Sequence, residues 1–549
     1  MKKYLTGLLL LQEKIMLRAY FFLFAIFFTI NISGQKLTYE SEYKFRNNVV
    51  NYHLYTNSFS LKNGEFLLVE EKKESTAPFP SPFNYNSFLQ GPRLLLIGTD
   101  GKLKRDLNIH KSLKETYKNV DIRWIEDIND EFTGIFFSVK NKKIKKKYFY
   151  LQKLSKNSLK FEGKVVLLDE STLKVSYTEG YHRLNSNSEN QIIFQYAKYV
   201  KKNVLIRNIA LNLKDFSIKK QIYTRKDENC STTTGIHINK KGVMFDFFIA
   251  KEEKGSKAIS ESYFAIGSNE TNKIVKNDIE FVPLNAKFIE FENGEIVINI
   301  SINFNQELRK HLCSSSYSYK YLPYTKGLFH AKLDNNGNFI NPTVSSITNE
   351  KIQHLPLKKF KVILKNTEGN EFYERGSRYS TIEWMGGKSF KLSNGKLLWV
   401  SETTRKTLLH IYSKEGNFLS SKIVDKGHAS SESGPEFNTR KRGQLNRYYF
   451  SKGNLKIFHP DVYKKKVGSK FFYFNSINLS VVDVNALLKM KKYDVTETVA
   501  VEKKKLDIKY EKLNRTAHFV ATMYNEKSGK VIMPVANLGR SSLLTLKVR

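Results

Sequence analysis

Residues 391–402 read KLSNGKLLWVSE, a polar turn centred on Asn394-Gly395 that is followed by a nearly continuous apolar run. Asn-Gly favours a tight β-hairpin because both residues tolerate positive φ, and the type I′ turn that the pair typically forms matches the twist of the flanking strands. A continuous apolar run is typical of a strand that is covered on both faces. The stretch therefore predicts a hairpin turn that leads into a buried strand, with Trp399 packed inside the fold.

The same pattern recurs along the chain. LKNGEFLLVEE (61–71) and FENGEIVINIS (291–301) are close copies, and NKKGVMFDFFIA (239–250) and SKGNLKIFHP (451–460) are looser ones. With the weakest copies included, the repeated strands begin near residues 64, 132, 191, 242, 294, 395, 453 and 530. Several copies are followed by a second hairpin with an acidic or polar turn that ends in Gly, as in residues 328–342 and 408–424. A repeated unit of about four strands predicts a β-propeller, whose blades bury their faces against their neighbours.

We therefore expect an all-β fold, a β-propeller of seven or eight divergent four-stranded blades, formed by residues 35–549 as a single domain with long inter-strand loops. The alternative is a tandem array of β-sandwich domains. The alternation of two hairpin types and the lack of a Pro/Gly/Ser-rich linker favour the propeller. Strands at residues 37–45 and 541–549 could pair to close the ring and remove exposed edges. The wide step from 294 to 395 holds either an inserted loop or an eroded extra repeat, and residues 301–312 and 484–493 are the clearest helix candidates.

The first 34 residues have the pattern of a signal peptide. Arg18 precedes the apolar run 19–30, and small or polar residues follow up to Gly34. The run is too short for a comfortable membrane span, which needs about 20 residues, although an uncleaved anchor is the alternative. Met16 could itself be the start, which leaves open whether residues 1–15 are translated. Gln35 stands where a lipoprotein signal needs Cys. We expect export to the periplasm, the cell surface or the medium, and a mature chain without a transmembrane segment.

The formal net charge of +38 suggests an anionic partner. However, Arg, which binds phosphate and carboxylate bidentately, accounts for only 18 of the 91 basic residues. The lysine excess disfavours a dedicated nucleic-acid reader, and an AT-rich genome would produce the same bias. Dense stretches such as KNKKIKKKY (140–148) and VEKKKLDIKYEK (501–512) could attract polyanions or protect hairpin tips and strand edges.

Local motifs for chemistry are absent from the sequence, which predicts neither a metal nor a cofactor. His330 and His410 occupy equivalent strands, and we interpret them as hydrogen-bonded strand residues rather than as a ring at the channel. The acidic group in 126–131, formed by Glu126, Asp127, Asp130 and Glu131, is interpreted as a solvated loop that connects two blades, and LDNNGN (333–338) as a hairpin turn. Catalytic residues stay unknown.

Two long polar loops, 72–92 and 425–447, are the best places for function, because long loops often carry it. The second loop concentrates basic side chains in a chain that is otherwise poor in Arg. Its candidate ligand-binding residues are His428, Arg440, Lys441, Arg442 and Arg447. Cys230 and Cys313 could form a disulfide in an oxidising compartment.

The short aromatic leader that ends in Gly-Gln and the degenerate NGxhhhV…DxxGxh hairpins (h, apolar) resemble those of divergent propeller-like proteins secreted by Bacteroidota. The resemblance spans residues 35–549 and implies an architecture and a compartment, but no catalytic residue. We expect an exported binding or scaffolding module of the cell envelope that recognises a protein or an anionic glycan at the cell surface. The alternative is an exported hydrolase or lyase for polysaccharide or peptide, with acids from different blades meeting at the propeller channel.

Overall fold

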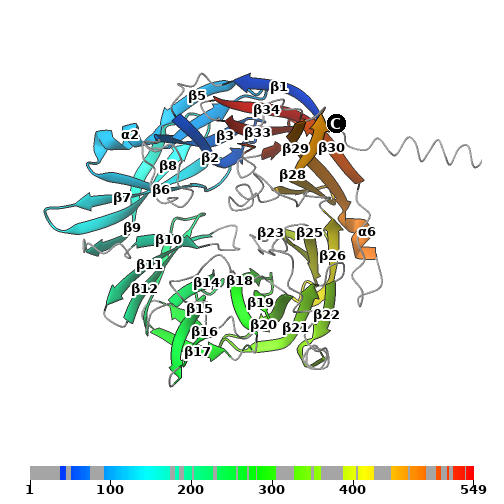
Figure 1. The fold of residues 1–549 in the computed structure, drawn as a ribbon. Coiled ribbons are helices and arrows are strands. Elements are labelled where there is room, and N and C mark those ends of the chain that lie inside the picture. The colour runs from blue at the N-terminus through cyan, green and yellow to red at the C-terminus, as the bar shows by residue number, and fades with distance from the viewer. Residues whose placement is uncertain are drawn as a thin grey trace, which may run out of the picture.

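Eight antiparallel β-sheets surround a common centre and form a β-propeller (Figure 1). The computed structural model describes residues 37–44, 51–74, 92–172, 180–184, 191–200, 203–226, 231–254, 257–268, 271–277, 279, 281–304, 327–347, 352–359, 388–402, 406–425, 447–467, 470–489, 502–508, 516–517, 523–537 and 540–548. The propeller prediction is confirmed, and the number of blades is eight.

Blades follow one another in chain order, and the first strand of each lies nearest the centre in Figure 1. Blades 1 to 4 comprise β2 (Asn51–Ser60), β3 (Phe66–Glu74), β4 (Arg93–Ile97) and β5 (Leu103–Asn108); β6 (Val120–Asp127), β7 (Phe132–Asn141), β8 (Lys146–Ser155) and β9 (Phe161–Thr172); β10 (Gly180–Leu184), β11 (Gln191–Val200), β12 (Asn203–Asn212) and β13 (Ile218–Lys226); and β14 (Ser231–Ile238), β15 (Met244–Lys254), β16 (Lys257–Ser268) and β17 (Thr271–Asn277). Blades 5 to 7 comprise β18 (Val282–Glu290), β19 (Ile296–Asn303), β20 (Gly327–Leu333), β21 (Phe339–Ile347) and β22 (Ile352–Pro356); β23 (Lys388–Lys391), β24 (Leu397–Glu402), β25 (Lys406–Tyr412) and β26 (Phe418–Asp425); and β27 (Arg447–Ser451), β28 (Asn454–Val467), β29 (Lys470–Asp483) and β30 (Glu502–Ile508).

Blade 8 closes the ring with strands from both ends of the chain. It contains β31 (Thr516–Ala517), β32 (Met523–Asn525), β33 (Lys530–Asn537), β34 (Arg540–Val548) and, as its outer strand, β1 (Leu37–Lys44). β1 pairs antiparallel with β34, with Leu37 opposite Val548 and Lys44 opposite Ser542. The predicted pairing of the two terminal strands is therefore confirmed.

The repeated strand of the sequence pattern is the second strand of each blade. β3, β7, β11, β15, β19, β24, β28 and β33 begin at or within three residues of the eight predicted positions. The wide step before residue 395 contains the extra fifth strand of blade 5, β22, which pairs with β21. Blades 5 and 6 pack directly against each other, with Leu328 of β20 against Trp399 of β24, so the step adds no blade between them.

The Asn-Gly turns differ from the predicted type I′ geometry. In the turn of blade 6, Gly395 has φ of 75°, whereas Asn394 is not among the residues with positive φ. Leu392 N–H donates to Lys396 O, and the Asn394 side chain accepts from Lys396 N–H. Glycine thus supplies the left-handed position of a five-residue connection, and asparagine contributes its side-chain acceptor instead.

The two ends of the blades differ. In an antiparallel meander, the turns between the first and second and between the third and fourth strands lie at one end, which we call the turn face. Contacts between blades confirm that these turns share a face: Asn525 Nδ2 donates to Leu61 O at 2.8 Å, and Lys391 Nζ lies 3.0 Å from a Glu292 carboxylate oxygen. The opposite end, which we call the crossover face, carries the hairpins between second and third strands and the connections from blade to blade.

Apolar side chains fill the seams between blades. In β24 the two faces of one strand serve two seams: Trp399 packs with Phe291 and Leu328 of blade 5, and Leu398 packs with Leu455 of blade 7. Trp399 is 2% exposed and stacks on His410. The expected burial of this strand on both faces, and of Trp399 between blades, is confirmed.

Helices are short in the described part of the chain, and none there is long and apolar enough to cross a membrane. α6 (Val484–Lys489) begins where the second helix candidate was expected. The other expectation was wrong at its start, because Ser301–Asn303 are the last residues of β19, and residues 305–312 lie outside the described residues. α2 (Ile109–Thr116) was not expected.

Candidate functional site

A concentration of lysine lies on blade 2 at the crossover face. The hairpin between β7 and β8, residues 140–147, is named here the basic hairpin. Four of its lysines, Lys140, Lys142, Lys143 and Lys145, are exposed. None of these four forms an ion pair with a residue that the structure describes. At the left of Figure 1, β7 and β8 lie on the same side of the ring as α2.

The tip of the basic hairpin has a defined backbone. Asn141 Oδ1 accepts hydrogen bonds from the backbone N–H groups of Lys143 and Ile144 at 3.2 and 3.4 Å. Lys145 has φ of 51°, in the left-handed region. Side-chain capping of a turn by Asn is a common local device. The result is a formed turn that projects three lysines and the 54% exposed side chain of Ile144.

Helix α2 and the segment that follows it add three exposed lysines to this end of blade 2: Lys111 and Lys114 of the helix, and Lys118 just after it. Asn108 caps the helix by accepting from Lys111 N–H at 3.0 Å. Ile109 and Leu113, one turn apart, are buried against blades 1 and 2. The hairpin and the segment after the helix are joined by a hydrogen bond from Lys140 N–H to Asn119 O. We call the seven exposed lysines of the basic hairpin and the α2 segment the basic surface.

At the basic surface, burial and neighbouring cations lower the pKa values of two basic groups, Lys147 and His110. Partial burial lowers the pKa of Lys147 to about 8, with further lowering by Arg123 and Lys140, although Asp121 opposes the shift. Lys140 lies directly opposite Lys147 across the β7–β8 ladder. Burial, and then the charge of Lys114, lower the pKa of His110 on α2. Positive charge is therefore incompletely balanced at this end of the blade.

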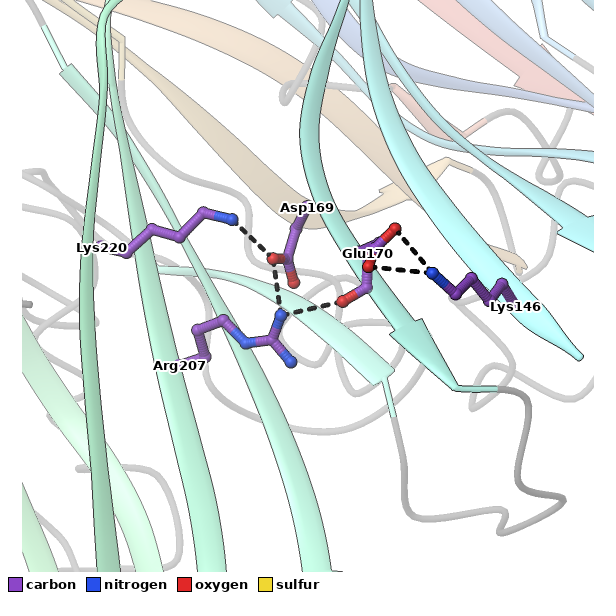
Figure 2. A network of polar contacts seen from close by, with 5 residues as sticks. All are labelled: Lys146, Asp169, Glu170, Arg207 and Lys220. Carbon is purple, nitrogen blue, oxygen red and sulfur yellow. Dashed lines mark hydrogen bonds and ion pairs between the residues drawn. The ribbon is translucent and has the colours of Figure 1, made fainter. Parts of the chain in front are cut away.

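The foot of the hairpin is fixed to blade 3 by the polar network of Figure 2. Lys146 Nζ lies 3.2 Å from a Glu170 carboxylate oxygen. The neighbouring Asp169, whose side chain is fully buried, accepts from Arg207 Nη1 at 2.7 Å and from Lys220 Nζ at 2.9 Å. Arg207 Nη1 also donates to Glu170 O at 2.8 Å. Strands β8 and β9 of blade 2 are thereby linked to β12 and β13 of blade 3.

The acidic group of residues 126–131 lies at the opposite end of the same blade, in the β6–β7 turn on the turn face. Asp130 pairs with Lys62 of blade 1 at 2.8 Å, and Asp127 pairs with Lys156, whose side chain is 2% exposed. Burial raises the pKa of Asp127 despite the proximity of Lys156. These carboxylates connect turns. The interpretation of the segment as a loop between blades was wrong, because residues 128–131 join β6 to β7 within blade 2. Blade 2 thus has an acidic turn at one end and the basic surface at the other.

His330 and His410 lie in one buried network between blades 5 and 6. Their ring centroids are 5.6 Å apart, and both side chains are at most 2% exposed. Nε2 of His330 lies 3.0 Å from Ser345 Oγ, and its Nδ1 hydrogen-bonds with Asn299 Oδ1. Nitrogens of His410 lie 2.9 Å from Ser401 Oγ and 2.6 Å from Ser421 Oγ. The histidines are hydrogen-bonded strand residues, as expected.

A second buried polar network, between blades 3 and 4, was not anticipated from the sequence. Asp246 of β15 is fully buried, and its Oδ2 accepts from Tyr223 Oη at 2.6 Å and from Asn208 Nδ2 at 2.9 Å. Gln195 Nε2 donates to the same oxygen at 3.2 Å. Burial and the Asp246 charge raise the pKa of Tyr223. The only sequence signal was a polar residue within an apolar strand, which does not identify its partners.

The ligand-binding residues expected in the loop 425–447 lie mainly outside the described residues. His428, Arg440, Lys441 and Arg442 are outside them. Arg447 begins β27, where it is opposite Phe458 in the ladder. Cys230, Cys313, the leader 1–34 and residues 75–91 also lie outside them. Asp334 of LDNNGN (333–338) lies in a hairpin turn, as expected, and its carboxylate accepts from the Asn336 and Asn338 N–H groups.

Over the described ranges, no group of three or more His, Cys, Asp or Glu side chains is arranged to hold a metal ion. The basic surface, in contrast, is a polar feature of the described residues that is open to solvent. The sequence pointed to its hairpin through KNKKIKKKY, but it did not indicate that α2 would add lysines beside it.

Comparison with known proteins gives similarity in fold only. No protein-family model and no curated protein matches the sequence. Among solved structures, prolyl oligopeptidase B from Galerina marginata is similar at 9% identity and a TM-score of 0.33, over 89% of this chain and 56% of the other. The chain thus spans just over half the length of that peptidase. A protein of unknown function from Dyadobacter fermentans matches at 8% identity and a TM-score of 0.29, over 93% and 99% of the two chains.

The β-propeller domain of the Trilobed protease from Pyrococcus furiosus matches at 7% identity and a TM-score of 0.29, over 77% of this chain and 93% of that domain. Glycosidases and a polysaccharide lyase are also among the similar structures. At these identities and TM-scores, no activity can be assigned to this chain.

Proposed function

We propose that the protein is an exported binding module of the cell envelope that recognises an anionic partner, foremost an anionic glycan, through the basic surface of blade 2. The observation that carries the proposal is the gathering of seven exposed lysines at one end of one blade, beside Lys147, whose pKa is lowered to about 8. An anion that binds beside Lys147 would stabilise the charged form of its side chain. Because the turn caps and the β7–β8 ladder hold the backbone in place, little ordering of the main chain is needed on binding.

Burial and ion pairing assign the other described charged clusters to structural roles. Three carboxylates pair with lysine or arginine at or near the seams between blades: Asp169, Asp127 and Asp130. Asp246 accepts hydrogen bonds from neutral side chains between blades 3 and 4. The basic surface differs from them because its lysines point into solvent without described acidic partners. This contrast supports a role in binding rather than in holding blades together.

The test is binding to dextran sulfate, a soluble polyanion, as a function of salt. Charge reversal of the hairpin lysines, Lys142→Glu, Lys143→Glu and Lys145→Glu together, should weaken binding by about tenfold or more and flatten its salt dependence, because fewer counterions are released. A matched control reverses three exposed lysines of the turn face: Lys102, Lys241 and Lys527.

Both triple variants have the same net charge, so the comparison separates a local site from the overall charge. The control should retain binding within about twofold, since more distant exposed charges are screened over roughly 10 Å at 0.1 M salt. Equal losses in the two variants would show that binding reflects diffuse charge and would contradict the proposal.

A further inference from the structure

We propose that the apex of the basic hairpin docks onto an anionic lipid surface, with Ile144 entering the boundary between headgroups and acyl chains and the surrounding lysines contacting the headgroups. This inference rests on the proposed function, because it uses three lysines of the basic surface. It goes further by naming a lipid surface as a partner and by giving an apolar residue a role in recognition.

Ile144 is the first observation. At 54% exposure it is the most exposed of the large apolar side chains for which the structure gives burial, followed by Leu167, Ile274 and Ile340 at 46%, 45% and 43%. Those three lie within strands in the outer part of their blades, in β9, β17 and β21. Ile144 instead occupies the apex of a hairpin. Single exposed apolar residues are common and need no explanation by themselves, so its surroundings decide the matter.

The surroundings of Ile144 are cationic. Lys142, Lys143 and Lys145 are its neighbours in the turn, and all three are exposed. A soluble anionic polymer would satisfy the lysines but would leave Ile144 in water. An anionic membrane offers both elements, headgroup charge at its surface and an apolar layer just below, and peripheral proteins use this combination of basic and apolar residues.

The geometry of the turn supports docking at small entropic cost. The Asn141 side chain caps two N–H groups of the turn, and Lys145 supplies the left-handed residue. Below the turn, the β7–β8 ladder begins with the pair Asn141–Lys146, and Lys146 also lies opposite Thr172 of β9. The apex is thus presented on a supported stem.

The expected strength is moderate. Each lysine near an anionic surface should contribute about fivefold in affinity, and insertion of the isoleucine side chain about tenfold. Such a contact gives reversible attachment, which is the usual outcome for a single peripheral anchor. Since the same lysines serve both partners, dextran sulfate should compete with vesicles.

The experiment is co-sedimentation of the protein with phosphatidylglycerol-containing vesicles, with phosphatidylcholine vesicles as the neutral control and dextran sulfate binding measured in parallel. Ile144→Ser should weaken binding to the anionic vesicles about tenfold and leave dextran sulfate binding unchanged. Ile274→Ser, the matched change at an exposed strand position of blade 4, should change neither. The hairpin triple charge reversal should reduce both.

Ile144→Trp provides a readout that does not depend on loss of function. Its fluorescence should shift to the blue with anionic vesicles and stay unshifted with dextran sulfate. Absence of the shift, or unchanged vesicle binding by Ile144→Ser, overturns the lipid inference. If the unmodified protein binds dextran sulfate but not the anionic vesicles, the inference fails and the proposed function stands. If the unmodified protein binds neither, both fail. An equal loss of dextran sulfate binding in Ile144→Ser would also overturn the inference.

Discussion

Asp169 illustrates how single residues hold neighbouring blades. Its fully buried carboxylate receives Arg207 and Lys220 from the next blade, while the adjacent Glu170 pairs with Lys146 at a half-exposed position. Removal of one partner of a buried ion pair destabilises the fold, because the remaining charge stays desolvated. A half-exposed pair contributes little because water and salt screen it. We therefore expect Asp169 to contribute much more to the stability of the fold than its neighbour Glu170.

We predict that Asp169→Asn lowers the free energy of unfolding by about 2–4 kcal/mol, since two cations lose their charged acceptor. Glu170→Gln, the control in the same strand, should cost about 1 kcal/mol or less. Urea unfolding of the two variants measures both values. Similar costs for the two substitutions would contradict the role assigned to Asp169.

Glu290 makes a pH-dependent contact between blades 4 and 5. Its carboxylate lies 3.3 Å from His237 Nε2 and accepts from Lys240 N–H at 2.9 Å. Burial alone would raise the pKa of Glu290, but the nearby His237 ring and the hydrogen bond from Lys240 N–H outweigh it, so the pKa lies below its ordinary value. A carboxyl group whose pKa is lowered by folding stabilises the protein above its unfolded pKa, and this contribution is lost as pH falls through the folded value.

Glu290→Gln should therefore reduce the free energy of unfolding by about 1 kcal/mol at pH 7, and the difference from the unmodified protein should shrink as the pH is lowered to about 3. Urea titrations at the two pH values provide the measurement. A difference that grows toward low pH would show that the charged form of Glu290 is not the one stabilised by folding.

At the residue scale, the sequence predicted the roles of single side chains better than it predicted which residues they contact. It correctly placed His330 and His410 in equivalent strands as hydrogen-bonded residues, because apolar-His-apolar alternation is typical of a strand. It could not show that their rings are 5.6 Å apart, since that contact depends on how two blades pack at a seam. The same limit applies to Asp246 and Asp169, whose partners are 23 to 51 residues away.

At the scale of elements, the turns of the turn face also serve as contacts between blades. Gly416 lies in the turn between β25 and β26 of blade 6, residues 413–417, and has φ of 76°. A Cβ added there would lie 3.2 Å from the ring of Phe291 in blade 5. Gly294 has a similar φ of 84°, but a Cβ added there would meet nothing within 4 Å. The two glycines thus share a backbone requirement and differ in packing.

Gly294→Ala is predicted to cost about 1 kcal/mol of stability, the price of the left-handed conformation for a residue with a Cβ. Gly416→Ala should cost about 2–3 kcal/mol, because crowding against Phe291 adds to the conformational term. Thermal unfolding of the pair measures the difference. Equal costs would mean that the seam accommodates the methyl group.

The strands were predictable because their signals are local. Each Asn-Gly or related turn followed by an apolar run marked the second strand of a blade, and all eight were located. The turn type was not, because a five-residue connection uses Gly alone at positive φ. Helix α2 was missed because it is short and has only Ile109 and Leu113 as buried apolar residues, so tertiary contacts rather than periodicity define it. The acidic and basic ends of blade 2 became visible only when the meander placed residues 126–131 and 140–147 at opposite ends.

At the scale of the whole molecule, the ring depends on β1. This strand forms the outer edge of blade 8 through its ladder with β34, and Glu40 lies 2.8 Å from Lys530 Nζ of β33. Without β1, the long edge of β34 would be unpaired, which is unfavourable and promotes association. The sequence predicted this closure from the strand-like patterns at both ends.

We predict that removal of residues 1–34 leaves the thermal unfolding midpoint within a few degrees of that of the full chain, whereas removal of residues 1–44 lowers it by about 5 °C or more. Differential scanning calorimetry compares the two truncations, and size-exclusion chromatography would detect association through the open edge. An unchanged midpoint after loss of β1 would show that the ladder with β34 contributes little to the ring.

The position of β1 also sets an order of events during biosynthesis. Leu37 of β1 and its partner Val548 of β34 lie 511 positions apart in the chain. Blades 1 to 7 can form as they emerge, since each is a meander of neighbouring strands, but blade 8 has to wait for the synthesis of β34 while β1 stays unpaired. If the leader directs export, as we expect, an open ring that cannot close early favours a chain that is still unfolded when it reaches the membrane. In that case the ring closes only after β34 has crossed the membrane.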